Sequence, residues 1–309
     1  MSPSLSVVVV VHDMARELPR TLETLAVPYQ RGIDPDTYEV IVVDNGSGRP
    51  VAAELIDAFP GHIRLVRLDP APPSPARAAN TGIELARGGV VGLIVDGARM
   101  ASPGLLALAA RAAGLAPVPV VATLGWHLGP ARHMDAATAG YDQRVEDDLL
   151  AGLDWRGDGY RLFEVSTLAG SSARGWFGPM GESSALFLPR PLWDALGGLD
   201  EAFALPGGGL VNHDLYRRAC ERADTELVVL LGEGTFHQYH GGAATSRRFG
   251  WDEMHADYEA HRGGPYRPPT ADPLFVGRVP ATTLTHLEES VRLALLRHHQ
   301  AGSGGSGGA

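Results

Sequence analysis

The sequence predicts an α/β protein built on a mostly parallel, doubly wound sheet. Continuous apolar runs rich in β-branched residues, such as Leu5–Val11 and 38–43, are typical of strands that are buried on both faces. Segments with helical spacing follow these runs, and strands that alternate with helices predict a parallel sheet. Turn-forming residues separate the elements, as in the segment 44–47, which reads DNGS.

The elements follow one another in a regular order over the first 125 residues. We expect strands at residues 5–11, 38–43, 63–68, 90–95 and 118–124, and helices at 17–25, 51–59, 76–87 and 103–115. Periodicity is weaker from 127 to 181, apart from a helix near 143–153. A second ordered block then predicts strands at 184–188 and 227–231, helices at 190–196 and 212–223, and an amphipathic helix at 281–299.

The predicted organisation is one large domain with a C-terminal extension. We place the main domain at 1–244, with a nucleotide-binding half at about 1–125 and an acceptor half at about 126–244. The extension covers 245–300, is polar and irregular before its terminal helix, and would shape the acceptor site or form a homodimer. Residues 301–309 have the Gly-Ser composition of a flexible linker or tag.

Composition excludes several classes of partner. The 309 residues are 44% hydrophobic and carry a formal net charge of -10, which argues against nucleic acid or an anionic membrane as the main partner. No apolar run approaches the roughly 20 residues that span a bilayer. The single cysteine, Cys220, permits no internal disulfide, and we interpret it as a small apolar filler in a cytoplasmic protein.

Polar side chains follow three of the predicted parallel strands. His12, Asp44 and Asp96 stand at strand ends, which is the edge where such sheets bind ligands. Asp44 would accept hydrogen bonds from a nucleobase or a ribose, or would cap its own turn. Asp96 would bind a divalent cation that bridges two phosphates.

Arginine and histidine residues add candidate phosphate and metal contacts. Arg77 and Asn80 begin a helix after a Pro-rich loop, a plausible phosphate site, although Arg77 could also be solvated. Arg99 would pair with Asp96 or meet the phosphates itself. His237 and His240 lie in a turn after a strand, where imidazoles bind Mn²⁺-type metals or serve a structural role.

Two acids are candidate general bases for an acceptor hydroxyl. Glu182 precedes a strand, and Asp214 lies near the start of a helix beside a glycine loop. The structural alternatives are an ion pair with an arginine for Glu182 and an interaction with the helix dipole for Asp214.

The ordered motifs resemble those of family 2 nucleotide-sugar glycosyltransferases, which have the GT-A fold. Segment 38–47, YEVIVVDNGS, is similar to the family's E-I-I-V-V-D-D-G-S, and segment 79–88, ANTGIELARG, resembles R-N-x-G-I-x-x-A-x-G. Segment 196–203, LGGLDEAF, resembles G-G-F-D-E-x-F, and 91–98 occupies the place of the strand that ends in the D-x-D metal motif. The resemblance covers about three-quarters of the chain.

The resemblance implies transfer of a sugar from a nucleotide-diphosphate donor to a hydroxyl of a saccharide, a lipid-linked glycan or a natural product, as in polysaccharide biosynthesis. Asp44 would then contact the nucleobase or ribose. Asp96 would lie near the ribose, the diphosphate and a Mn²⁺ or Mg²⁺ ion, and His237 would bind the metal or the diphosphate.

Two departures from the family pattern leave the chemistry open. Ala98 replaces the second aspartate of D-x-D, so metal binding would rest on Asp96 and His237, or Arg99 would supply the charge instead. Asn212 occupies the place of the usual catalytic acid, so Glu182 or Asp214 would substitute, or the enzyme would be retaining. The alternatives are a non-catalytic module that binds nucleotide sugars or glycans and, with less support, a sugar nucleotidyltransferase.

Overall fold

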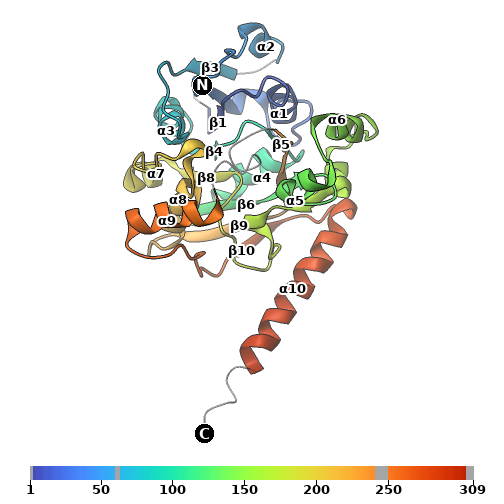
Figure 1. Cartoon of the computed structure of the whole chain (residues 1–309), viewed down its shortest axis with the longest axis vertical. Helices are drawn as coiled ribbons and strands as arrows, with labels where there is room; N and C mark the ends of the chain where they lie inside the picture. The colour runs from blue at the N-terminus through green and yellow to red at the C-terminus, as the bar shows by residue number, and fades with distance from the viewer. Residues whose placement is uncertain (1–2, 60–62, 241–249, 304–309) are drawn as a thin grey trace.

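The computed structural model describes residues 3–59, 63–240 and 250–303, and these residues form one central sheet with helices on both faces (Figure 1). The strands are β1 (Leu5–Val11), β2 (Tyr38–Asp44), β3 (Ile63–Arg67), β4 (Val90–Ile94), β5 (Arg99–Ala101), β6 (Pro119–Leu128), β7 (Ser166–Leu168), β8 (Leu186–Pro189), β9 (Glu226–His237) and β10 (Leu274–Gly277). The main path has the order β10-β9-β6-β8-β4-β1-β2-β3. Only β8 is antiparallel to its neighbours on this path, which confirms the mostly parallel sheet.

The helices cover both faces of this sheet. They are α1 (Leu18–Leu25), α2 (Ala53–Asp57), α3 (Ala76–Leu85), α4 (Leu105–Ala112), α5 (His133–Ala136), α6 (Gln143–Ala151), α7 (Arg190–Leu196), α8 (Val211–Cys220), α9 (Trp251–Arg262) and α10 (Leu284–Ser303). Alternate residues of β1 enter two separate cores: Val8 packs with α3, α7 and α8, whereas Val9 packs with α1 and α4. This division explains why every residue of β1 is buried.

The sequence analysis did not predict the short elements β7 and α5, nor three others that bear on the site and the C-terminal extension, β5, α9 and β10. β5 has three residues and pairs antiparallel with the end of β9, with Arg99 opposite His237. α9 occupies a segment that we expected to be irregular, and Tyr258 is its only buried residue. β10 pairs in parallel with β9, so the C-terminal extension contributes a strand to the sheet.

The predicted boundary of the extension at 244/245 lies outside the described residues, as do residues 304–309 of the predicted linker, so both stay predictions. α10 begins against the body of the molecule and runs away from it (Figure 1). Among the described residues, no helix is both long enough and apolar enough to cross a membrane.

Candidate active site

A cavity of about 1010 Å³ opens at the carboxyl ends of β1 and β4. It is lined by the loops that follow β1, β2 and β3, by Glu182 and by the start of α8. The predicted site residues that line it are His12, Asp96, Arg99, Glu182, His237 and His240. The fold therefore brings residues from four distant parts of the chain to one cavity.

Asp96, His237 and His240 form a compact cluster in the wall of this cavity. Nε2 of His237 lies 2.6 Å from Oδ2 of Asp96, and Nε2 of His240 lies 3.4 Å from the same oxygen. One potential ligand atom from each of the three residues lies within 4.8 Å of the other two. The other carboxylate oxygen, Oδ1, accepts a hydrogen bond from the backbone N–H of Ala98 at 2.9 Å. The backbone N–H of Ala98 thus orients the carboxylate of Asp96. Ala98 itself stands where the D-x-D motif has its second aspartate.

The electrostatics of the cluster suit a cation. Burial alone would raise the pKa of Asp96, but the adjacent His237 and His240 outweigh it and hold that pKa well below its ordinary value. Burial lowers the pKa of His237, against the opposing effect of Asp96. For His240, burial alone would lower the pKa, but the effect of Asp96 outweighs burial and raises the pKa. Divalent metals such as Mn²⁺ bind an ionised carboxylate and neutral imidazoles, so the donor set fits such an ion, which would displace the proton of His240 on binding.

Arg99 adds a positive charge to the same wall. Its Nη1 is buried and, among the described residues, has no hydrogen-bond partner. The structure thus does not pair Arg99 with Asp96. Because a buried guanidinium N–H without an acceptor is costly, its position in the cavity wall favours an anionic ligand there.

Glu182 and Asn212 lie on the acceptor side predicted from the sequence. Glu182 lines the cavity, and its Oε2 lies 3.5 Å from Nδ1 of His213. Asn212 also lines the cavity, and its buried Oδ1 has no hydrogen-bond partner within the described part of the chain. A carboxylate that can accept a proton and an amide that cannot therefore both line this cavity.

Three predicted ligand residues, Asp44, Arg77 and Asn80, lie outside this cavity. Asp44 is 1% exposed, and its carboxylate accepts hydrogen bonds from the backbone N–H of Ser47 and Val51 and from Arg67. This is the turn-capping arrangement. Arg77 is exposed on α3 and does not line the cavity.

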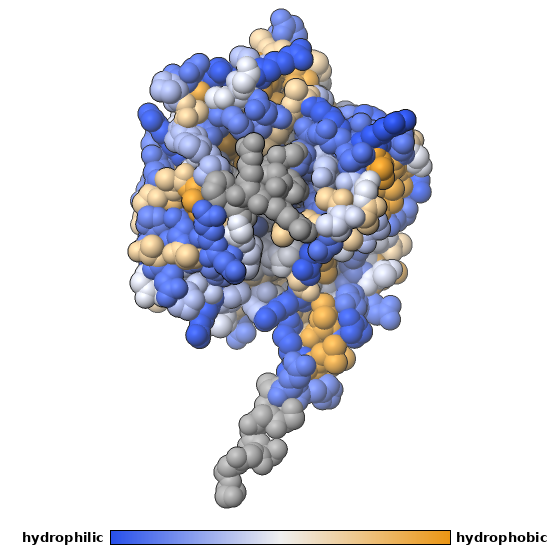
Figure 2. Space-filling view, in the orientation of Figure 1, coloured by the Kyte–Doolittle hydropathy of each residue, from blue (hydrophilic) through white to orange (hydrophobic). Residues whose placement is uncertain are grey.

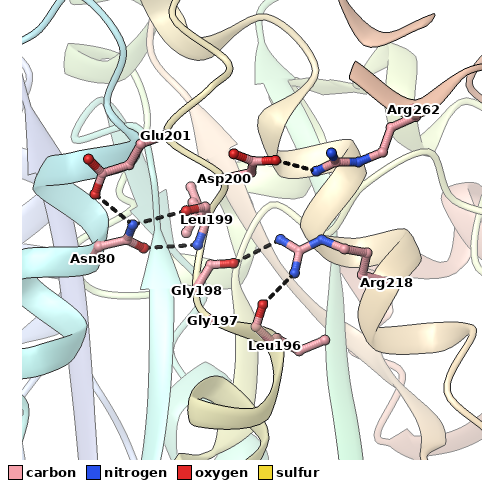
Figure 3. A pocket seen from close by; sticks show the side chains of 9 residues that line it. All are labelled: Asn80, Leu196, Gly197, Gly198, Leu199, Asp200, Glu201, Arg218 and Arg262. Atoms are coloured by element: carbon pink, nitrogen blue, oxygen red, sulfur yellow. Dashed lines mark hydrogen bonds and ion pairs between the residues drawn. The ribbon is translucent and has the colours of Figure 1, made fainter. Parts of the chain in front are cut away.

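Asn80 lies beside a second, smaller pocket of about 480 Å³ (Figure 3). Its amide group donates to the carbonyl of Leu199 and accepts from the N–H of the same residue, at 2.9 Å in each case. In Figure 3, Arg218 donates to the carbonyls of Leu196 and Gly198, so the turn between α7 and α8 is held from both sides. Asn80 therefore serves the packing of this turn.

Asp214 is buried behind the same pocket rather than in the large cavity. Its carboxylate binds Arg218 at 2.7 Å and Arg262 at 2.5 and 2.8 Å. Both oxygens are occupied by these arginines, and Asp214 is not among the residues that line the large cavity. Its predicted role as a base stays a prediction.

Comparison with known proteins identifies this architecture. Residues 6–96 match the family described as Glycosyl transferase family 2. Residues 6–96 are therefore similar to this family, and the chain has the GT-A fold. The matched range ends at Asp96, so Arg99, His237 and His240 lie beyond it.

Solved structures agree with the fold. The mannosyltransferase PcManGT from Pyrobaculum calidifontis, in complex with GDP-Man and Mn²⁺, is 17% identical with a TM-score of 0.52, covering 99% of this chain and 77% of its own. S. aureus TarS is 11% identical with a TM-score of 0.51, covering 77% of this chain. TarS 1-349 in complex with UDP-GlcNAc is 13% identical with a TM-score of 0.51, covering 82% of this chain and 66% of that one. No curated protein matches the chain, which spans only 37% of the length of TarS.

Proposed function

We propose that the protein is a glycosyltransferase that moves a sugar, of the hexose type, from a nucleotide-diphosphate donor to an acceptor hydroxyl. The observation that carries this proposal is one cavity that is lined by Asp96, Arg99, Glu182, His237 and His240. GT-A structures with GDP-Man and Mn²⁺ or with UDP-GlcNAc support the donor class.

The donor diphosphate would lie against the wall formed by Asp96 and Arg99. Asp96, His237 and His240 would hold Mn²⁺ or Mg²⁺, which supplies positive charge that stabilises the leaving diphosphate when bound. Arg99 would donate hydrogen bonds to the phosphate oxygens. His12, at the end of β1, would contact the donor from the opposite side.

The acceptor hydroxyl would lie near Glu182. Its oxygen attacks the anomeric carbon of the donor sugar, the bond from that carbon to the diphosphate breaks, and the proton of the hydroxyl passes to Glu182. Asn212 cannot accept a proton at neutral pH, so Glu182 is the base of an inverting reaction in this proposal. Leu215 and Met254, which also line the cavity, would pack on the apolar face of a saccharide, a lipid-linked glycan or a natural product.

The test is a turnover assay with a panel of nucleotide sugars and simple glycan acceptors, with and without Mn²⁺. We expect release of a nucleoside diphosphate together with a new glycosidic bond that mass spectrometry detects. Donor binding by calorimetry, measured in parallel, separates failure of binding from failure of transfer.

The second candidate function is a non-catalytic module that binds nucleotide sugars. Ala98 and Asn212 favour it, because the two positions where the family has acids hold residues that neither bind a metal nor take a proton. Tight donor binding with no transfer to any acceptor and no hydrolysis would support this module and contradict the transferase.

We further propose that α10 pairs with α10 of a second copy of the chain. His286 and Ser290 face the body of the molecule, where Nε2 of His286 lies 2.9 Å from the carbonyl oxygen of Phe163. Another side of α10 carries an exposed apolar stripe, which consists of Leu284, Val291 and Leu295 with exposed fractions of 55%, 42% and 54%. Figure 2 shows a band of apolar surface on this projecting helix.

Charge complementarity favours an antiparallel pair. If the two helices cross near Ser290, Leu284 of one copy meets Leu295 of the other, and Glu288 meets Arg292. Light scattering of the full chain should give the mass of a dimer, and Val291→Glu should give a monomer. Leu85→Glu, at an exposed leucine on α3, is the matched control. A monomeric wild-type chain would contradict the pairing.

A cytoplasmic setting is part of the proposal. Cys220 is buried, and burial raises the pKa of its thiol to about 12, so it stays protonated and unreactive. A chain whose single thiol is kept inert suits the reducing compartment expected from the sequence.

A further inference from the structure

A buried histidine that belongs to no predicted motif lies directly behind His237. His133, the first residue of α5, is fully buried. Its Nε2 lies 3.0 Å from the carbonyl oxygen of Leu128, and its Nδ1 lies 3.1 Å from Nδ1 of His237. A row of contacts thus runs from the carbonyl oxygen of Leu128 through His133 and His237 to the carboxylate of Asp96.

The contact with Leu128 decides which nitrogen of His133 carries a proton. A carbonyl oxygen only accepts hydrogen bonds, so Nε2 of His133 must be the donor. A neutral imidazole has one N–H, and Nδ1 of His133 is then an acceptor. The ring of His133 is fully buried, and Oε2 of Glu146 lies 3.9 Å from its Nε2, beyond hydrogen-bond distance, so a charge on this ring would be costly and the ring is neutral.

The same reasoning then fixes the tautomer of His237. Two Nδ1 atoms 3.1 Å apart can share only one hydrogen, and since His133 accepts, His237 must donate. Nε2 of neutral His237 is left unprotonated, and its lone pair points at Oδ2 of Asp96, 2.6 Å away. Nε2 of His240 lies 3.2 Å from Nε2 of His237 and 3.4 Å from the same oxygen of Asp96, so a hydrogen on His240 can bridge the two in the metal-free cluster. A bound cation would take the place of that hydrogen.

We propose that His133 is a positioning residue that holds His237 in the Nδ1–H tautomer, so that Nε2 is ready to bind a divalent cation together with Asp96. This inference rests on the proposed function of the cavity. Residues that hold metal-binding histidines in this way commonly change metal affinity when they are replaced.

The surroundings of His133 keep its ring in place. Its backbone N–H donates to Nδ1 of His127 at 2.9 Å, and the two rings pack with centroids 4.4 Å apart. Oε2 of buried Glu146 lies 3.9 Å from Nε2 of His133 and also accepts a hydrogen bond from the backbone N–H of Tyr239 at 2.7 Å. Glu146 thus ties the position of His133 to the loop that carries His237 and His240.

The test reads the tautomer directly by long-range ¹⁵N–¹H NMR of the metal-free, ¹⁵N-histidine-labelled full chain at neutral pH. We expect His237 to carry its hydrogen on Nδ1 in the wild type and in His133→Asn, which retains an acceptor oxygen near the position of Nδ1. In His133→Phe the acceptor is gone, so we expect the hydrogen on Nε2, where it is donated to Asp96. The Kd for Mn²⁺ should then rise about 10- to 100-fold.

His286→Phe is the matched control, because it also removes a histidine whose Nε2 contacts a carbonyl oxygen but lies outside the cavity. Its His237 tautomer and Mn²⁺ affinity should equal those of the wild type. An Nε2–H tautomer in the wild type would overturn the inference without any variant, and so would an unchanged Kd for Mn²⁺ in His133→Phe. Absence of sugar transfer in a chain with the expected tautomer and Mn²⁺ binding would contradict the proposed function alone.

Discussion

Nε2 of His237 lies 2.6 Å from Oδ2 of Asp96, although 141 positions separate the two residues in the sequence. The short strand β5 produces this contact. The chain leaves β4, turns at Asp96, and returns in β5 against the end of β9, so that Arg99 pairs with His237. This one strand pairing thereby fixes the candidate metal ligands Asp96 and His237 and the candidate phosphate ligand Arg99.

Asp96→Asn should abolish most of the binding of Mn²⁺. The change removes the only carboxylate of the cluster while it retains the size of the side chain and the oxygen that faces Ala98. Calorimetry should show a loss of Mn²⁺ affinity of more than about tenfold, the lower end of what outer-shell partners contribute. Asp135→Asn, at an exposed aspartate on α5, should bind Mn²⁺ as the wild type does. Equal affinity in both variants would place the metal elsewhere.

Arg99→Gln should weaken the binding of nucleoside diphosphates by about 10- to 100-fold, because a hydrogen bond to a charged group contributes roughly 1.5–3 kcal/mol. The effect should be smaller for the nucleoside itself, which lacks phosphates. Arg77→Gln is the informative control, since the sequence also suggested a phosphate contact there but the structure leaves Arg77 exposed. Titration of both variants with the same diphosphate distinguishes the two arginines, and a larger loss in Arg77→Gln would reverse the assignment.

Glu182→Gln should lower kcat by about 10²- to 10⁴-fold, the usual contribution of a general base. Donor affinity should stay close to that of the wild type, because Glu182 contacts the acceptor hydroxyl and not the donor diphosphate in our proposal. Single-turnover kinetics with saturating donor would measure this difference. Glu54→Gln, at an exposed glutamate on α2, should have no effect. Wild-type rates in Glu182→Gln would exclude Glu182 as the base.

Asp214→Asn should affect stability rather than chemistry. Asp214 is 1% exposed and pairs with Arg218 and Arg262, and removing one partner of a buried ion pair costs about 3 kcal/mol. Urea unfolding should show this loss, while kcat at a temperature where the variant is folded should be nearly unchanged. A large fall in kcat with unchanged stability would instead make Asp214 the base.

Asp44→Asn should change how stability depends on pH. Burial alone would raise the pKa of Asp44, but hydrogen bonds from Ser47, Val51 and Arg67 outweigh it and lower that pKa. A carboxyl whose folded pKa lies below its unfolded value stabilises the fold above the unfolded pKa and loses that contribution as pH falls through the folded one. The wild type should therefore exceed Asp44→Asn in unfolding free energy at pH 7, and the gap should narrow below pH 3.8. A constant gap from pH 7 to pH 3 would contradict this.

The sequence predicted the strands and helices that bury many apolar side chains. β1 is apolar except for buried Ser6, and the helix predicted at 190–196 has those bounds as α7. The sequence did not predict β10, because it has four residues and exposes Leu274 and Phe275. α9 was missed because a helix with one buried side chain has no apolar periodicity.

The sequence predicted only those residues of the candidate site that stand at the ends of apolar strands. Asp96 and His237 follow apolar strands, and a polar group at a strand end is visible in the sequence. The role of His133 is not visible in the sequence, because its contact with His237 depends on how α5 packs against the end of β9. The local signal in the sequence was that His127 and His133 stand six positions apart. In the structure the backbone N–H of His133 donates to Nδ1 of His127.

The central claim is that Asp96, His237 and His240 hold a divalent cation beside the donor diphosphate. The most direct measurement is anomalous diffraction at the manganese absorption edge from crystals of the full chain grown with Mn²⁺ and a nucleoside diphosphate. The account predicts one strong peak within bonding distance of Oδ2 of Asp96 and Nε2 of His237, with phosphate density next to Arg99. A peak at another site, or a bound diphosphate with no peak at these residues, would contradict it.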